Sequence, residues 1–389
     1  MLVWMMYRIK FILETFLEGI KMKFSRRKDM CLIYNYAQHY RTNIFQLMDK
    51  EFHCDFIFGD KLGDIKKMDY ALLSNYKEVS NIRLFGNWYY QTNTISAVRQ
   101  YKKLFILGEL YCLSTWLILF LAPFYHTKIY FWTHGWYGKE SFLVKKIKKV
   151  FFNMSDGIFL YGNYAKKLMI KEGFQENKLF VLHNSLQYSK QLKLRQSLST
   201  SSLYREHFKN QFHNLIFIGR LTSVKKLDLL IEALSLLRNE GAIYNLTLIG
   251  DGIEKESLEN LVIESGLKDN VWFYGACYDE KTNAELIYNA DLCIAPGNVG
   301  LTAIHTLTFG TPVITQGNLS WQMPEFEAIN KGITGDFFKQ NNVQDLALCI
   351  KKWFDSKKDR DDIRKACYHE IDSFWTPDYQ IGIMKRHLL

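Results

Sequence analysis

The chain has 389 residues, which is long enough for two domains with separate buried cores. Hydrophobic residues make up 48% of it and only five residues are proline, which excludes a disordered or fibrous protein. The formal net charge of +10 favours an acidic partner, such as a nucleic acid, an anionic membrane surface or a phosphorylated substrate.

Residues 1–28 are predicted to form an N-terminal extension. They contain Glu14 and Glu18 within an apolar stretch and no small-residue cleavage site, which argues against a secretory signal. Two interpretations remain open. The segment is either an amphipathic interfacial helix with a basic rim or a dispensable extension ahead of a true start at Met22.

The first half of the chain alternates short apolar runs with helical patterns, which predicts a parallel, doubly wound sheet. The predicted strands are 31–35, 54–59, 82–86, 128–134, 157–162 and 179–184. The most membrane-like run, 106–125, contains Glu109 and Pro123. We therefore interpret it as a buried helix that leads into a strand, and not as a membrane span.

The segment 141–153 combines apolar and basic residues in one predicted helix. Its apolar residues are Phe142, Leu143, Ile147, Val150 and Phe151, and its basic residues are Lys145, Lys146, Lys148 and Lys149. A basic amphipathic helix of this kind can rest on anionic lipid. The alternative is a surface helix with a solvated basic face and an apolar stripe that packs on the core.

A polar stretch at 191–212 is the predicted interdomain linker, because it is rich in Ser, Lys, Arg and Gln and has no strong period. A second alternating series follows it. The strands predicted there are 214–220, 245–250, 271–275, 291–295 and 312–315. The clearest helix of this series has one apolar face, made of Leu227, Leu230, Ile231, Leu234 and Leu237, and Gly241 is placed to close it.

The sequence therefore predicts an α/β protein with two Rossmann-like domains, at 29–190 and 213–366. Ligands of such sheets bind outside the carboxyl ends of the strands. Two such domains in tandem leave a central cleft between the carboxyl ends of their sheets, where we expect the functional site.

The run APGNVGLTAIHTLTFGTPVIT at 295–315 joins a strand end, a glycine-bearing turn and a helix start. The helix opens at Gly300, Leu301 and Thr302, whose unpaired backbone N–H groups and positive dipole end suit an anion.

Two cations are predicted to lie near this helix start. Arg220 directly follows a strand, and Lys225 lies at the entry to the next helix. Together with the helix start they would surround a diphosphate, Arg220 through bidentate hydrogen bonds and Lys225 as a point charge. The alternative is a pair of solvated cations, but cations at a helix start oppose the helix dipole and so need another reason to be there.

Four motifs in the second half carry a family resemblance. GRLTSVKKLDLLIEAL, LTLIGDG, VWFYG and PGNVGLTAIHTLTFGTPVIT, in this order and spacing, resemble the nucleotide-sugar domain of glycosyltransferase family 4 (group 1). The first half resembles the family more weakly, through YAQHYRTNIF and FWTHGWYGKE. The C-terminal segment 367–389, which contains WTPDYQ, resembles the helix that crosses back to the first domain.

The resemblance implies a GT-B fold, a nucleoside-diphosphate sugar as co-substrate, no metal and no other cofactor, and transfer with retention of anomeric configuration. It places Arg220 and Lys225 at the positions of the donor-phosphate cations, and we group them with His134 as the predicted catalytic residues. His134 ends a strand and is predicted to contact the donor sugar or the acceptor, although it can equally be structural.

The chain departs from the family pattern at two positions. Gly297 and His305 stand where the family usually has two glutamates. His305 can still bind a ribose hydroxyl, because a neutral imidazole both donates and accepts hydrogen bonds. Gly297 cannot replace a carboxylate, so Glu325 and Glu327 are alternative sources of that contact, and Asn298 is a further donor-binding candidate.

Acceptor-side residues are expected after the first strand, where His39, Tyr40 and Arg41 lie. These three residues can equally form a polar helix cap. The seven cysteines are scattered without a disulfide or metal pattern, which fits a reducing cytosol.

Together these features predict a retaining, metal-independent glycosyltransferase. Its acceptor is predicted to be a saccharide, lipid-linked, in bacterial surface polysaccharide synthesis (capsule, O-antigen or exopolysaccharide), in the cytoplasm or peripherally on the inner face of the cell membrane. The alternative is a catalytically impaired nucleotide-sugar-binding or scaffold protein, motivated by Gly297 and His305. A dinucleotide-dependent oxidoreductase is disfavoured because the first βα turn lacks GxGxxG, and nucleic-acid binding because the cations form no recognisable module.

Overall fold

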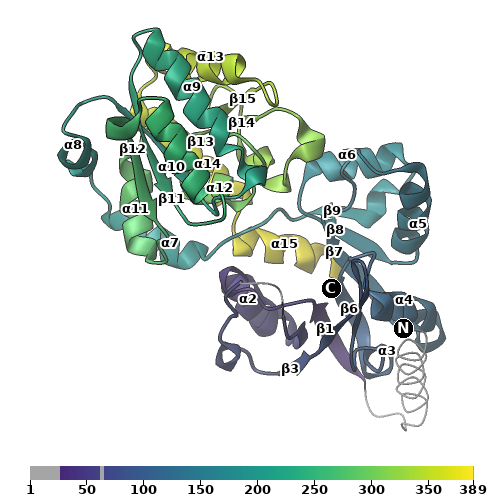
Figure 1. The fold of residues 1–389 in the computed structure, drawn as a ribbon. Coiled ribbons are helices and arrows are strands. Elements are labelled where there is room, and N and C mark those ends of the chain that lie inside the picture. Colours follow the sequence, from purple (N-terminus) through teal and green to yellow (C-terminus); the bar gives the residue numbers. More distant parts are fainter. Residues whose placement is uncertain (1–26, 62–64, 389) are drawn as a thin grey trace. The chain divides into compact units, whose positions relative to one another are not determined.

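The computed structural model describes residues 27–61 and 65–388, which divide into two compact units (Figure 1). Unit 1 falls within Met1–Leu182 and Ile381–Leu389, and unit 2 is His183–Gln380. Each unit is built on one parallel sheet, as the alternating pattern predicts. Both interpretations of the N-terminal extension concern residues outside the described part of the chain.

Unit 1 contains a seven-stranded sheet in the order β3-β2-β1-β6-β7-β8-β9, in which every neighbouring pair is parallel. Its strands are β1 (Lys28–Tyr34), β2 (Asp55–Gly59), β3 (Tyr76–Val79), β6 (Tyr101–Leu107), β7 (Lys128–Thr133), β8 (Gly157–Leu160) and β9 (Leu179–Val181). Its helices are α2 (Thr42–Phe52), α3 (Ala97–Gln100), α4 (Leu113–Leu121), α5 (Phe142–Asn153), α6 (Asn163–Lys171) and the end of α15 (Pro377–Leu388).

Alternate residues of β1 enter two buried clusters, as the strand period requires. Cys31 and Ile33 belong to one cluster, and Leu32 belongs to the other. The second cluster also contains Ile381 and Met384 of α15, so the end of the chain completes the core of unit 1.

Two parts of unit 1 differ from the prediction. Residues 82–86 are not a strand of the parallel sheet, because β4 (Asn81–Phe85) and β5 (Trp88–Gln91) form a separate antiparallel hairpin that turns at Gly86, where φ is +54°. Residues 106–125 are not one helix, because Ile106 and Leu107 end β6 and α4 begins only at Leu113. The apolar run passes from strand to helix without a change in composition, so periodicity could not separate them.

Unit 2 contains a six-stranded parallel sheet in the order β12-β11-β10-β13-β14-β15. Its strands are β10 (His213–Ile218), β11 (Tyr244–Ile249), β12 (Val271–Gly275), β13 (Leu292–Ala295), β14 (Val313–Gln316) and β15 (Gly335–Phe338). Its helices include α7 (Tyr188–Ser197), α8 (Leu203–Phe208), α9 (Leu227–Asn239), α10 (Lys255–Glu264), α11 (Glu280–Asn289), α12 (Leu301–Thr308), α13 (Val343–Asp355) and α14 (Arg360–Phe374). The predicted apolar face of α9 is buried, and Gly241 follows the helix with φ +85°, as predicted.

The predicted linker at 191–212 instead holds most of α7 and the whole of α8, and both helices pack within unit 2. Gln191 of α7 donates to Glu280 Oε1 at 2.7 Å, and the Tyr204 hydroxyl of α8 donates to the Leu286 carbonyl at 2.7 Å. Each of these polar helices buries one side chain, which is too little to produce a periodic signal. The chain returns to unit 1 at Ile381, later than the predicted residue 367, because α14 lies in unit 2.

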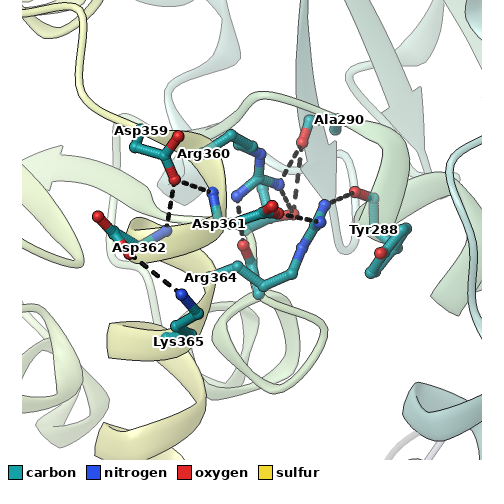
Figure 2. Close-up of polar contacts among 10 residues, drawn as sticks. Tyr288, Ala290, Asp359, Arg360, Asp361, Asp362, Arg364 and Lys365 are labelled. Carbon is teal, nitrogen blue, oxygen red and sulfur yellow. Dashed lines mark hydrogen bonds and ion pairs between the residues drawn. The ribbon is translucent and has the colours of Figure 1, made fainter.

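Two arginines at the start of α14 hold the ends of other helices in unit 2 (Figure 2). Arg360 donates to the Ala290 carbonyl at 2.8 Å and to Thr311 Oγ1 at 3.1 Å. Arg364 donates to the Tyr288 carbonyl at 3.1 Å and lies over its ring. Carbonyls at a helix end lack intrahelical partners, so these contacts stabilise the end of α11 and the turn after α12. Both helices carry residues of the candidate site.

Candidate functional site

Lys225 lies at the centre of the candidate site in unit 2. It ends a short 3-10 turn after β10, and its ammonium donates to the Asn298 carbonyl at 2.8 Å and to Asn298 Oδ1 at 2.9 Å. Burial lowers the pKa of Lys225 to about 8; the Glu325 carboxylate opposes this shift and the Arg220 guanidinium adds to it. The two predicted cations and the predicted Asn298 and Glu325 therefore act on one another in a single cluster.

Gly297 is the point at which the loop after β13 touches the loop that bears Lys225. The Gly297 N–H donates to the Lys225 carbonyl at 3.0 Å. A Cβ at Gly297 would lie 2.0 Å from the Val224 oxygen and 2.8 Å from Lys225 Cα. No side chain fits there in this arrangement, which gives a physical reason for glycine where the resemblance predicts glutamate.

A buried glutamine organises the same loop. Gln322 donates through Nε2 to Thr315 Oγ1 at 2.9 Å and to the Gln316 carbonyl at 2.8 Å, and its Oε1 accepts the Val299 N–H at 2.9 Å. These bonds hold the loop ahead of α12. Gln322 could not be predicted from the sequence, because a single glutamine between two 3-10 turns belongs to no motif.

The start of α12 is tied to the strand that precedes Arg220. Thr302 Oγ1 donates to the Ile218 carbonyl at 2.8 Å, and Gly300 enters the helix with φ +53°. The first N–H groups of a helix have no intrahelical partner, and its positive dipole end favours an anion. The structure thus brings the predicted Gly300, Leu301 and Thr302 next to the end of β10, where Arg220 follows.

Glu325 lies in the 3-10 helix Pro324–Ala328 and is buried. Its Oε1 accepts a hydrogen bond from Asn184 Nδ2 at 2.8 Å, and its charge acts on Lys225. The structure therefore places Glu325 near Lys225, and its contact with a donor sugar stays a prediction. Glu327 lies on the same turn and is half-buried.

His305 on α12 is paired with a carboxylate that the sequence analysis missed. Its Nε2 lies 3.0 Å from Glu280 Oε1, the oxygen that also accepts from Gln191. Burial raises the pKa of Glu280, but His305 and Gln191 outweigh it and the pKa is lowered overall. In the neutral tautomer that carries its proton on Nε2, the imidazole donates to the Glu280 carboxylate and Nδ1 can accept a hydrogen bond from a hydroxyl. Glu280 lies far from His305 in the chain, so no spacing could reveal the pair.

In unit 1 the predicted Arg41 and His134 come together around Tyr161, which follows β8. Buried Arg41 donates to the Tyr161 hydroxyl at 2.9 Å and lies over the Trp132 ring. The His134 ring centroid lies 4.6 Å from that of Tyr161. Burial lowers the pKa of His134 to about 4, with the charges of Arg41 and Lys148 adding to the shift. His134 is therefore neutral at physiological pH and suits hydrogen bonding.

His39 and Tyr40 lie in the turn that precedes α2. The backbone N–H of His39 donates to the Lys66 carbonyl at 3.0 Å, and its carbonyl accepts from Thr42 Oγ1 at 2.7 Å. Arg41 occupies the N-cap position of α2 but makes no side-chain capping hydrogen bond, so the structure does not support the capping alternative. The Arg41 guanidinium instead contacts Trp132 and Tyr161.

Glu109 is a second carboxylate that the sequence analysis missed. It follows β6, where it accepts from the Tyr89 hydroxyl at 2.5 Å and from Asn35 Nδ2 at 3.4 Å. Burial raises its pKa. The carboxyl ends of β1 and β6 thus present an amide and a carboxylate, beside the phenol of Tyr89 in β5. Groups of these kinds bind sugar hydroxyls. The predicted helix over 106–125 concealed this position.

Over the described ranges, 27–61 and 65–388, no group of three or more His, Cys, Asp and Glu side chains is arranged to hold a metal ion. In the same ranges no helix has both the length and the apolar character needed to cross a membrane. The seven cysteines are free.

Comparison with known proteins gives matches over both units. Residues 204–370 match the family model for glycosyl transferases group 1. Mannosylfructose-phosphate synthase of Agrobacterium fabrum is 26% identical over 230 residues, which cover 56% of this chain and 46% of that protein. Poly(glycerol-phosphate) alpha-glucosyltransferase of Bacillus subtilis is 21% identical over 250 residues, which cover 62% of this chain and 34% of that protein. The chain spans less than half the length of these two relatives.

Solved structures share the fold. Anabaena Alr3699/HepE in complex with UDP has a TM-score of 0.69 and 14% identity, over 92% of this chain and 99% of that chain. A glycosyltransferase from Rickettsia africae has a TM-score of 0.69 and 16% identity, over 93% and 98%. At these identities the likeness concerns the fold alone.

Proposed function

Because residues 204–370 belong to the glycosyl transferases group 1 family and the chain has a GT-B fold of two parallel-sheet α/β units, we propose that the protein transfers a sugar from a nucleoside-diphosphate donor to a saccharide acceptor. The observation that supports this most strongly is the cluster of Arg220, Lys225 and the α12 start. Two cations and a helix N-terminus at the carboxyl edge of one sheet form a site for a diphosphate.

We propose that the cations stabilise the leaving group. As the bond between the anomeric carbon and the diphosphate oxygen breaks, negative charge grows on that oxygen, and Arg220 and Lys225 would stabilise it. The acceptor hydroxyl forms the new bond on the same face, and its proton passes to the departing phosphate oxygen, so the anomeric configuration is retained. Neutral His134 would hydrogen-bond the sugar, and no metal is required.

Asn298, Glu325 and His305 would complete the donor side. In this proposal Asn298 positions the Lys225 ammonium, with Glu325 as the nearby carboxylate, while Nδ1 of His305 accepts from a ribose hydroxyl. His39, Tyr40 and Arg41 stay the predicted acceptor-side residues of unit 1.

The relatives guide the choice of donors and acceptors to test. A solved Anabaena structure contains UDP-glucose, and a Mycobacterium tuberculosis mannosyltransferase, 34% identical over 103 residues, is GDP-mannose-dependent. Another solved structure is a lipopolysaccharide outer core galactosyltransferase with a TM-score of 0.65. For this chain we propose a lipid-linked saccharide acceptor in bacterial surface polysaccharide synthesis, at the inner face of the cell membrane.

The test is turnover with UDP- and GDP-sugars and lipid-linked saccharides extracted from bacterial membranes. We expect release of the nucleoside diphosphate, a product with the donor's anomeric configuration by NMR, and no loss of rate with EDTA. An inverted product would contradict retention, and a rate abolished by EDTA would contradict metal independence.

Gly297 motivates a second candidate function, a nucleotide-sugar-binding protein without catalysis, because a carboxylate of the family pattern is missing there. Donor binding without turnover across the whole acceptor series would favour this alternative over the transferase.

A further inference from the structure

Helix α5 of unit 1 turns an apolar stripe toward solvent. Leu143, Ile147, Val150 and Met154 recur at intervals that place them on one side of the helix, and they are 66%, 37%, 57% and 39% exposed. Phe142 at the helix start is 74% exposed. The alternative from the sequence, an apolar stripe that packs on the core, is wrong, because Phe151 is the only one of the five predicted apolar residues that is buried.

The inner face of α5 fixes this orientation. Lys148, predicted for the basic face, is buried and donates to the Gly135 carbonyl and to Glu140 Oε1, both at 2.7 Å. Phe151 and Phe152 enter the core beside it. Turning the stripe inward would break a buried ion pair and expose two aromatic rings, so the apolar face stays in solvent.

Lysines flank the stripe. Lys146 is exposed and lies over the Phe142 ring, 4.4 Å from its centroid. Lys149 is exposed and donates to the Glu172 carbonyl at 2.6 Å, and the Glu172 carboxylate pairs with Lys145 at 2.6 Å. The acidic groups facing α5, Glu172 and Glu140, are thus each already paired with a lysine, and the rim is basic.

Neighbouring α4 also exposes apolar side chains. Trp116 of α4 packs on Phe151 of α5 with ring centroids 4.9 Å apart. Phe120 of α4 and Phe124, just beyond it, are 63% and 70% exposed. Monomeric proteins rarely expose so many large apolar side chains together, and an apolar patch with a polar rim marks an interaction site.

We propose that the α5 face, defined by Phe142, Leu143, Ile147, Val150 and Met154 with Lys146 and Lys149, docks unit 1 on an anionic lipid surface. The apolar side chains would enter the boundary between headgroups and acyl chains, and the lysines would lie at the level of the lipid phosphates. The basic rim favours anionic lipid over a second copy of this basic chain, which would bring like charges together. The surface lies outside the candidate donor site, so the inference goes beyond the transfer reaction.

The test is co-sedimentation of the full chain with vesicles of phosphatidylcholine, with or without about 30% phosphatidylglycerol. We expect binding at least about tenfold tighter to the anionic vesicles. The double variant Leu143→Glu/Val150→Glu should lose at least about tenfold of that affinity. Lys146→Gln and Lys149→Gln should each lose about fivefold, on anionic vesicles alone.

The matched control is Ile253→Glu/Tyr278→Glu, which replaces side chains that are 86% and 95% exposed in unit 2 and should bind vesicles as the wild type does. Urea unfolding of every variant separates a lost contact from a lost fold.

Three outcomes would overturn the proposal: absence of binding to anionic vesicles, binding that the α5 variants leave unchanged, or an α5-dependent dimer in solution that buries the face. Donor turnover measured without vesicles reports on the transferase separately, so failure of one proposal is distinguishable from failure of the other.

Discussion

The pKa of Lys225 predicts that affinity for a nucleoside diphosphate falls above pH 8. Burial lowers this pKa to about 8, so the ammonium is about nine-tenths protonated at pH 7 and about one-tenth protonated at pH 9. A diphosphate keeps its negative charge over this range. Of the two forms of Lys225, only the protonated ammonium attracts this charge. The apparent dissociation constant should therefore be about tenfold higher at pH 9 than at pH 7, in proportion to the lost competent fraction.

Isothermal titration calorimetry with UDP and with GDP, from about pH 6.5 to about pH 9.5, measures this profile. The Lys225→Arg variant is the matched control, because its guanidinium stays charged throughout and should flatten the profile. Wild-type affinity that stays level to pH 9 would refute the reasoning. So would an equal fall in Lys225→Arg, because the titrating group would then lie elsewhere.

Single contacts predict the effects of three further substitutions. Gly297→Ala should lower the free energy of unfolding by about 2 kcal/mol or more, because its Cβ would lie 2.0 Å from a backbone oxygen. The control is Gly382→Ala in α15, where an added Cβ meets no atom within 4 Å, so this variant should be neutral or stabilising. Equal urea midpoints for these two variants would contradict the clash. His305→Ala should reduce the preference for UDP over 2′-deoxy-UDP from about tenfold to near one, because the ribose loses its acceptor; an unchanged ratio in calorimetry would place the ribose elsewhere. Arg360→Ala should lower the free energy of unfolding in urea by about 2–3 kcal/mol, because buried carbonyls lose a charged donor. The control Lys365→Ala, at an exposed position, should lower it by less than about 0.5 kcal/mol. Equal losses in the two variants would show that the helix-end contacts contribute little.

Strand burial explains which parts of the fold the sequence predicts. Central strands of both sheets are buried on both faces, so they appear as apolar runs. Strand β3 was missed because Val79 is its only buried residue, and residues 82–86 were assigned to the wrong sheet because a hairpin strand and a parallel strand share the same residue types.

The residues of the candidate site likewise fall into those that the sequence predicts and those that it does not. Arg220, Lys225 and the α12 start were predictable because each lies at a fixed place in a continuous strand–turn–helix motif. Glu280 and Gln322 were not, because each acts through a partner that only the tertiary fold brings near. At Gly297 the sequence shows that a carboxylate is missing, and the structure adds the reason, a backbone contact with the loop of Lys225.

The most direct test of the claim that Arg220 and Lys225 bind the diphosphate is to measure donor turnover by the Arg220→Ala and Lys225→Ala variants. The control is Lys226→Asn, which removes a neighbouring charge at a position of φ +53° that asparagine tolerates. Nucleoside diphosphate release should fall about tenfold to a hundredfold in each of the two alanine variants and stay near wild type in the control. Wild-type turnover in both alanine variants would contradict the assignment of the site.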